Sequence, residues 1–285
     1  MAPAKKVDFP QSGKAITYIV PYAAGASTDI SARLLASFRE TDLGVPVQVI
    51  NKPGASTQVA MTDLANAKPD GYTIGTVDIP TGGITYLLPD RKAVYSRKSF
   101  QALRMLYATY ACWAVKEDSP YKSVNDVVEA ARAKPGEIKI GDPALMSGYH
   151  LSNVAVQEAA KVRFNLVHFD GSGPATTALL GGHIDVATTS FASGLAAFKG
   201  GQTRFIGTMG PKRDPFFPAV KTFEEQGYKV PGNGPAFFAS AAPAGLPPEI
   251  REILSASIQR ATASADFQKK AGELVLSLWD LGPAE

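Results

Sequence analysis

The stretch Tyr22-Ala23-Ala24-Gly25-Ala26-Ser27-Thr28-Asp29 lies between an alternating apolar segment and a run with helical spacing that begins near Ile30. Small residues form the turn, and Ser27 or Thr28 is placed to cap the helix, so that backbone N–H groups can face an anion. The pattern predicts a strand, a turn and a helix. Taken alone, it fits an ordinary strand-to-helix turn better than a binding site, because α/β proteins contain many such turns.

Strand-like and helix-like segments alternate along the rest of the chain. Strands are predicted at residues 16–20, 45–50, 72–77, 138–140, 164–169, 184–188 and 204–208. Helices are predicted at residues 30–38, 59–67, 123–133, 149–161, 174–180 and 249–262. This alternation favours mainly parallel sheets covered on both faces, with ligands at the carboxyl ends of the strands.

Two long runs rich in aromatic residues and alanine, 103–115 and 235–241, differ from this pattern and predict strands that cross between domains. A chain of 285 residues is also long enough for two domains. We therefore expect a first lobe of residues 1–103 plus 242–285. The second lobe is expected to cover residues 104–241, including crossing strands near 104–115 and 235–241.

Composition excludes several classes of protein. The formal charge is +3, from 29 basic and 26 acidic side chains without a block of like charge, so neither nucleic-acid binding nor a membrane patch is expected. No apolar run is long enough for membrane insertion. The first 13 residues lack the apolar core of a signal peptide. The chain is therefore either cytosolic or a mature exported form with a start Met added.

Motifs for catalysis, cofactors or metals are not evident. The sequence has no Gly-x-Gly-x-x-Gly after a strand, no phosphate loop, no nucleophile elbow and no His-Glu-x-x-His, so no cofactor is expected. Cys112 is the single cysteine, and its apolar neighbours predict a packed thiol. Of three scattered histidines only His150 is at a turn where it could face a ligand, and no metal site is expected. His168 and His183 are expected to be structural.

Two carboxylates and several aromatic residues fall in the predicted turns. Asp29 and Asp170 could form an acid/base pair, but a carboxylate near a helix start is stabilised without any catalysis, so capping is the favoured interpretation. The aromatic residues would form an apolar wall around a carbon skeleton; they are Tyr22, Tyr149, Phe169 and Phe191.

Seven motifs in the same order resemble the periplasmic solute-binding proteins of tripartite tricarboxylate transporters, the Bug or TctC-like family, over nearly the whole chain. They are IVPYAAGASTDISAR (19–33), VINKPGA (49–55), PDGYT (69–73), FDGSGPA (169–175), LGGHID (180–185), TFEEQG (222–227) and PAGLP (243–247). The usual Gly-Gly of the first loop is Gly25-Ala26 here, which narrows the backbone angles allowed. The family normally continues into a terminal helix beyond the point where this chain stops, so a shortened chain or an uncovered first lobe is expected.

The resemblance implies a type II-like periplasmic-binding-protein fold, with two α/β lobes whose mixed sheets are flanked by helices, and a carboxylate held between the lobes partly through ordered waters. Carried over to this sequence, it implies first-lobe contacts from Tyr22, Ala24, Ala26, Ser27 and Asp29. The second-lobe contacts it implies are Ser147, His150, Gly171, Ser172, Pro174 and Ser190. The predicted turns add Gly25, Asp78, Pro80, Tyr149, Asp170 and Phe191 to the candidate site.

The favoured hypothesis is a monomeric, non-catalytic periplasmic binding protein whose signal peptide has been removed. It would capture a small organic acid, first a dicarboxylate and next an aromatic carboxylate, and deliver it to membrane transporter subunits. Two alternatives stay open: a cytosolic α/β enzyme that uses Asp29, His150 or Asp170 as acid/base groups, and a binding protein that reports to a sensor kinase.

Overall fold

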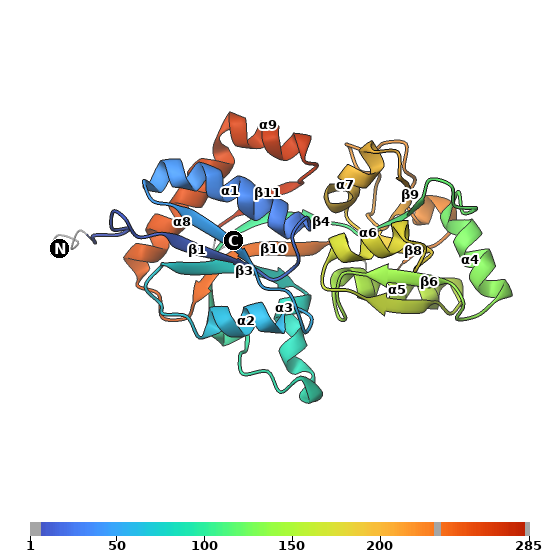
Figure 1. The fold of residues 1–285 in the computed structure, drawn as a ribbon, viewed down its shortest axis with the longest axis horizontal. Coiled ribbons are helices and arrows are strands. Elements are labelled where there is room, and N and C mark those ends of the chain that lie inside the picture. The colour runs from blue at the N-terminus through green and yellow to red at the C-terminus, as the bar shows by residue number, and fades with distance from the viewer. Residues whose placement is uncertain (1–6, 231–234, 283–285) are drawn as a thin grey trace.

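Residues 7–230 and 235–282 of the 285-residue chain are described by a computed structural model. Two β-sheets form the centres of two lobes that lie side by side, and helices pack against each sheet (Figure 1). The mixed α/β architecture with two lobes confirms the predicted fold class.

The first lobe is built on a six-stranded sheet in the order β11-β4-β10-β3-β1-β2. The first three strands of the chain pair in parallel, and β10 and β11 run antiparallel to their neighbours. The strands are β1 (Ile16–Val20), β2 (Val47–Asn51), β3 (Thr73–Ile79), β4 (Phe100–Thr109), β10 (Ala236–Pro243) and β11 (Leu278–Leu281). Its helices are α1 (Ser27–Leu43), α2 (Gln58–Ala65), α3 (Thr81–Ile84), α8 (Pro248–Ala263) and α9 (Ala265–Glu273), with short 3-10 helices at Thr85–Leu87, Pro89–Arg91 and Arg97–Ser99.

The second lobe is built on a five-stranded sheet in the order β7-β6-β8-β5-β9. Its strands are β5 (Cys112–Lys116), β6 (Lys139–Asp142), β7 (Asn165–His168), β8 (Val186–Thr189) and β9 (Thr203–Thr208). Its helices are α4 (Val124–Ala133), α5 (Gly148–Ala160), α6 (Ser172–Leu180) and α7 (Phe191–Lys199), with a 3-10 helix at Glu224–Gln226. β6, β7 and β8 are parallel, so the turns that follow them open at one edge of the sheet.

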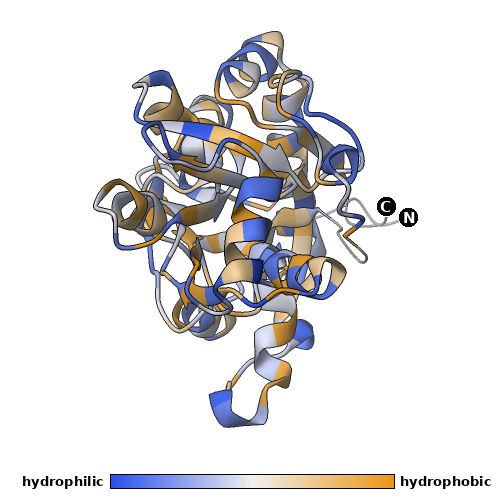
Figure 2. Cartoon of the chain, turned by 90° about the vertical axis from the view of Figure 1, so that its right-hand side faces the viewer, coloured by the Kyte–Doolittle hydropathy of each residue, from blue (hydrophilic) through white to orange (hydrophobic). Residues whose placement is uncertain are grey.

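Buried apolar side chains fill both lobes, and one cluster of them continues from the first lobe into the second. In the second lobe Trp113 is fully buried, its ring lies edge-on to Phe164 and Phe223, and its indole N–H donates to Asn153 Oδ1 at 2.9 Å. In the first lobe Tyr107 stacks on Phe238 with ring centroids 4.5 Å apart. Hydrophilic and hydrophobic residues alternate in bands along the helices, as expected for helices that cover a sheet on one side only (Figure 2).

The predicted crossing strands differ from the structure. The run 103–115 is not one strand: β4 ends at Thr109 in the first sheet and β5 begins at Cys112 in the second, so the chain crosses at Tyr110 and Ala111. The run 235–241 is part of β10, which hydrogen-bonds to β3 and β4 in the first sheet. We therefore propose that the lobes divide at 110–111 and that the chain from Ala236 onward belongs to the first lobe.

Several elements were not predicted from the sequence, among them α3, α7, α9 and β11. α9 packs against α1, and β11 lies beside β4, so both cover the first lobe, which the resemblance had suggested was uncovered. Cys112 is buried, and burial raises the pKa of its thiol well above the ordinary value, which confirms the predicted packed thiol. Within residues 7–230 and 235–282, none of the helices is sufficiently long and apolar to cross a bilayer.

Leu254 tests the core of the first lobe. It is fully buried on α8, which packs against α1 and β4. We expect Leu254→Ala to lower the free energy of unfolding by about 2 to 5 kcal/mol, because the substitution leaves a cavity. Leu87, which is 62% exposed, provides the matched control, and Leu87→Ala should change stability by less than about 0.5 kcal/mol. Equal losses in urea unfolding of the two variants would contradict this packing.

Candidate functional site

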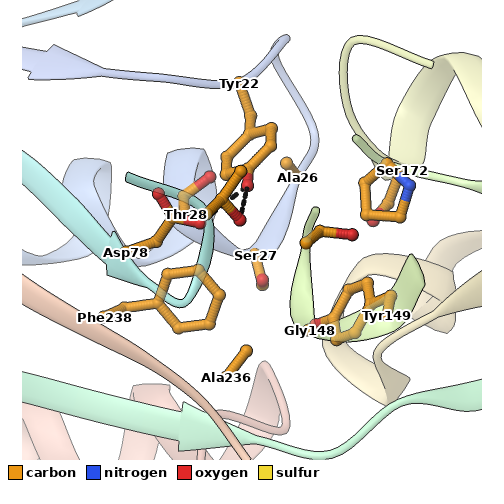
Figure 3. A pocket seen from close by; sticks show the side chains of 13 residues that line it. Tyr22, Ala26, Ser27, Thr28, Asp78, Gly148, Tyr149, Ser172, Ala236 and Phe238 are labelled. Atoms are coloured by element: carbon orange, nitrogen blue, oxygen red, sulfur yellow. Dashed lines mark hydrogen bonds between the residues drawn. The ribbon is translucent and has the colours of Figure 1, made fainter. Parts of the chain in front are cut away.

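A pocket lies between the two lobes, with walls from both (Figure 3). The space between its side chains is about 330 Å³ if the open mouth is included. The cavity itself has a volume of only about 20 Å³. This is room for about one water, so a larger ligand needs the lobes to move apart. The lining residues are Tyr22, Ala26, Ser27, Thr28, Asp78, Thr81, Pro143, Ser147, Gly148, Tyr149, Ser172, Ala236 and Phe238.

The turn after β1 forms the first wall and starts α1. Neither Ser27 nor Thr28 caps the helix as predicted: Ala26 is the N-cap residue and Ser27 is the first helical residue. Ala26 has ordinary extended angles (φ −68°), so alanine fits where the resembling family has its second glycine. Gly25 takes the left-handed conformation, with φ 84°. The Ser27 hydroxyl accepts a hydrogen bond from Tyr107 at 3.2 Å.

The hydroxyl of Thr28 is buried and has no hydrogen-bond partner in the described part of the chain. A buried hydroxyl without a partner is costly unless a ligand or water satisfies it. Thr28 lines the pocket, one residue into α1, where the first N–H groups of a helix also lack acceptors within the helix. The first wall therefore offers a hydroxyl and backbone donors at the same place.

Asp29 does not line the pocket, although the sequence suggested it as a ligand contact. Its carboxylate accepts from Gly25 N–H and Asn51 Nδ2, each at 3.0 Å, and pairs with Arg33 at 2.9 Å. Burial alone would raise the pKa of Asp29, but the bonds from Arg33, Gly25 and Asn51 hold it below the ordinary value. Asp29 therefore fixes the turn and is not free to act as an acid or base.

Near the end of β3, Asp78 forms a hydrogen-bonded group with Tyr22 and Thr81. Asp78 is 2% exposed and accepts from the Tyr22 hydroxyl at 2.8 Å and from Gly82 N–H at 3.2 Å. The Thr81 hydroxyl is 3.1 Å from the Tyr22 oxygen. Burial raises the pKa of Asp78, against the hydrogen bonds from Thr81 and Tyr22. Tyr22 and Asp78 lie together on the first-lobe side of the pocket in Figure 3.

The second wall is made by the starts of α5 and α6. Ser147 caps α5 by accepting from His150 N–H at 3.0 Å. α6 begins at Ser172 with Gly171 as its N-cap residue, so Pro174 is not at the first helical position as predicted. Gly171 has φ 134°, and a Cβ there would be 3.2 Å from the backbone nitrogen of Ala23 in the other lobe. Glycine is required at this point because of both the angle and the close approach of the lobes.

Direct hydrogen bonds join the two walls. The Ser27 N–H donates to Ser193 Oγ at 2.8 Å, and the Ala23 N–H donates to the Asp170 carbonyl at 3.1 Å. Ser193 lies in α7, which the sequence did not predict. These bonds cross from the first lobe to the second, so they hold the lobes in the closed arrangement described here.

His150 lies beside the site without lining it. Its Nδ1 accepts from Met146 N–H at 3.1 Å, and its ring is 4.7 Å from that of His168, which contacts the buried Asp142 carboxylate at 2.9 Å. Burial, and then the charge of His168, lower the pKa of His150 to about 4. His150 is therefore neutral near pH 7, and its Nδ1 is already occupied.

Of the residues predicted for the site, the pocket brings together Tyr22, Ala26, Ser27, Asp78, Ser147, Tyr149 and Ser172. Ala24, Gly25 and Asp170 are exposed outside it, Ser190 caps α7, and Phe191 stacks in an aromatic cluster with Phe205 and Phe217. Pro80 lies against Gly148, across the lobe boundary. The sequence missed Thr28, Thr81, Pro143, Gly148, Ala236 and Phe238; the first four lie in predicted turns, whereas Ala236 and Phe238 lie in the run 235–241 that was predicted as a strand.

The charges around the pocket come from helix ends and from one carboxylate. The starts of α1, α5 and α6 meet at the pocket, and a helix N-terminus carries partial positive charge and free N–H groups. Lysine, arginine and histidine are not among the lining residues, and Asp78 is the acidic one. Across the described ranges 7–230 and 235–282, three or more His, Cys, Asp or Glu side chains are nowhere grouped to hold a metal ion.

Two lobes around a pocket at helix N-termini define a binding protein of the two-lobed periplasmic class. The family model for the tripartite tricarboxylate transporter family receptor (TctC) matches residues 31–280, and the chain belongs to this family. Members of the family are periplasmic binding proteins that serve as receptors for a transporter.

Relatives and solved structures agree with this assignment. The UPF0065 protein in the gbd 5' region of Cupriavidus necator is 31% identical over 99% of this chain and 83% of its own length. BugT of Bordetella pertussis is 29% identical over 92% of this chain and 80% of its own. Among solved structures, one described as a periplasmic transporter superposes with a TM-score of 0.89 at 28% identity, over 96% of this chain and 91% of its own. MatC of Rhodopseudomonas palustris with bound malate superposes with a TM-score of 0.84 at 26% identity, over 94% of this chain and 90% of its own.

Ser193 provides a test of the contact between the lobes. Ser193→Ala removes the acceptor of the Ser27 N–H, so we expect the open arrangement to gain about 1 kcal/mol, roughly a fivefold change in the ratio of open to closed. The expected observation is a larger radius of gyration in small-angle X-ray scattering. Ser123→Ala, which removes a helix cap inside the second lobe, is the control and should lower stability without changing the radius. An unchanged radius for Ser193→Ala would show that this bond does not hold the lobes together.

Proposed function

We propose that this chain is a periplasmic solute-binding protein that captures a small organic acid between its lobes and delivers it unchanged to membrane transporter subunits. One observation carries the proposal: three helix N-termini from both lobes meet at a pocket that has no cationic side chain. An acid is the ligand that such donors favour. Membership of a family of transporter receptors supports the delivery step. We propose that the protein works as a monomer, because both walls come from one chain.

The acid group would be held by neutral donors. Thr28 carries a buried hydroxyl without a hydrogen-bond partner in the described part of the chain, and Tyr149 carries another buried hydroxyl; both line the pocket. Burial raises the pKa of the Tyr149 hydroxyl, against its interactions with the hydroxyls of Ser190 and Thr109. Together with the N–H groups in the first turns of α5 and α6, and those of α1 that follow Ser27, these hydroxyls would surround a carboxylate without any ion pair. Ser147 and Ser172 complete the proposed set of contacts.

The proposed ligand is a small dicarboxylate before an aromatic carboxylate. The cavity between the described lobes is small, which favours a short carbon skeleton over an aromatic ring. Phe238, Ala236 and Pro143 give it a short apolar side for a few carbon atoms. The similar MatC structure contains malate, a dicarboxylate with four carbons.

Binding would be coupled to closure of the lobes. The described arrangement leaves space for about one water, so the acid would enter an open form and the second lobe would then close over it. A ligand stabilises the closed state only by its higher affinity for that state. The Ser27 to Ser193 bond is made only when the lobes meet, so it adds to that difference.

The alternative of a cytosolic enzyme receives little support from the geometry. Asp29 is saturated by three partners, His150 is neutral with Nδ1 occupied, and Asp170 is exposed outside the pocket. The proposed acid/base residues therefore do not converge on one place where a reacting atom could bind. Among binding proteins, the family match favours a partner transporter over a sensor kinase.

Thr28 gives the sharpest test of the proposal. Thr28→Val keeps the shape and removes a hydroxyl that bonds to nothing in the described protein. We expect calorimetric titration to show an approximately tenfold weaker affinity for the acid, because one hydrogen bond to a charged group is lost, with no loss of thermal stability in the free protein.

The matched control is Thr57→Val. Thr57 also has a buried hydroxyl without a described partner, but it lies at the start of α2 outside the pocket. Its substitution should leave affinity unchanged. A screen of organic acids by thermal shift selects the acid, and NMR of the mixture should show it chemically unchanged. Turnover of the acid, or equal affinities for Thr28→Val and the wild type, would count against the proposed function.

A further inference from the structure

We infer that the pocket selects acids that also carry a hydrogen-bond donor, a hydroxyl or an ammonium group, and that Asp78, Tyr22 and Thr81 recognise this donor. The inference rests on the proposed function, because it concerns the same pocket and narrows the class of acid. We name these three side chains the acceptor group.

The protons of the acceptor group are all used inside it. The Tyr22 hydroxyl donates its single proton to Asp78 Oδ2 at 2.8 Å. The Thr81 hydroxyl, 3.1 Å from the Tyr22 oxygen, has one proton, and it is directed to Tyr22 or to Asp78. Gly82 N–H supplies a third hydrogen bond, to Asp78 Oδ1. A carboxylate has about four acceptor sites and each hydroxyl oxygen has two, so lone pairs are in excess. Toward a ligand this group can accept hydrogen bonds and has none to donate.

The rest of the pocket lining has the opposite character. Thr28 has a buried hydroxyl without a partner in the described part of the chain, Tyr149 adds a second buried hydroxyl, and the starts of α1, α5 and α6 supply N–H groups. Figure 3 shows Tyr22 and Asp78 on the first-lobe side of the pocket, with Tyr149 and Ser172 on the facing side. A ligand that fills the pocket therefore meets donors from both lobes and, on the first-lobe side, the acceptor group as well. Its carboxylate fits the donors, and the remainder of the molecule has to satisfy the acceptors.

The energetic consequence is a penalty for plain acids. A second carboxylate placed against Asp78 would bring two like charges together in a buried site, and no cationic side chain lines the pocket to offset them. A methylene in the same place would remove water from the acceptor group and give it no donor in return. Sites built to hydrogen-bond a ligand reject the analogue that lacks the bonding group much more strongly than apolar pockets reject a missing methylene.

The test compares acids with one carbon skeleton. Calorimetric titrations would use three series: propionate, lactate and alanine; succinate, malate and aspartate; glutarate, 2-hydroxyglutarate and glutamate. In the series that binds, we expect the hydroxy or amino acid to bind at least tenfold more tightly than the unsubstituted acid. Asp78→Asn, whose amide can donate, should reduce this preference to less than about threefold.

A second variant and a control keep the test valid if the Asp78→Asn variant does not fold. Tyr22→Phe removes one of the two hydroxyl oxygens of the acceptor group. Like Asp78→Asn, it should reduce the preference for hydroxy and amino acids over the unsubstituted acid. Tyr18→Phe removes another buried hydroxyl of the first lobe, which is bonded to Ser240 at 2.6 Å and lies outside the pocket. Tyr18→Phe should leave the preference unchanged even if it lowers stability.

The outcomes separate this inference from the proposed function. If the unsubstituted acid binds as tightly as its substituted partners, the inference is wrong and the proposed function stands. The same holds if the unsubstituted acid binds more tightly as the pH falls, since Asp78 would then carry a proton and donate it. If no acid of any series binds, the proposed function fails and the inference fails with it.

Discussion

The first N–H group of α1 has its hydrogen-bond acceptor in the opposite lobe, and the rest of the site depends on this contact. The Ser27 N–H has no acceptor within its own helix and donates to Ser193 Oγ of α7 instead, while Ala23 N–H donates to the Asp170 carbonyl. Gly171 allows the backbones to approach this closely. Because the lobes meet here, the N-termini of α5 and α6 come to lie opposite that of α1, and a pocket of donors forms that neither lobe has alone.

Local sequence was sufficient to predict the strands and helices on either side of the turns. It was not sufficient to predict what single residues in those turns do. The small residues of the first turn and the helical spacing after it predicted β1 and α1 correctly. Asp29, in contrast, looked like a ligand contact because its partners are not adjacent in sequence: Asn51 ends β2, and Arg33 is one helical turn away. Thr28 was taken as a possible cap because the helix was expected to start one or two residues later than it does.

Other misses have the same origin in long-range packing. α7 contains Gly194, which weakens a helix, and it is stabilised by its tight packing on Phe205, where a Cβ on Gly194 would be 2.8 Å from the ring. Ala236 and Phe238 reach the pocket because β10 is inserted between β3 and β4. The two long aromatic runs suggested two lobes correctly, yet their strands belong mostly to the first sheet, since strand pairing at such distances leaves no local pattern.

We propose that neutral donors at helix starts bind an acid between the lobes, and a crystal structure of the protein with a bound acid is the direct test. We expect carboxylate oxygens within hydrogen-bonding distance of N–H or hydroxyl groups at the starts of α1, α5 and α6, with no lysine or arginine in contact. An acid bound instead in the groove beside Lys212 and Arg213, on the side of Tyr110 and Trp279, would contradict it.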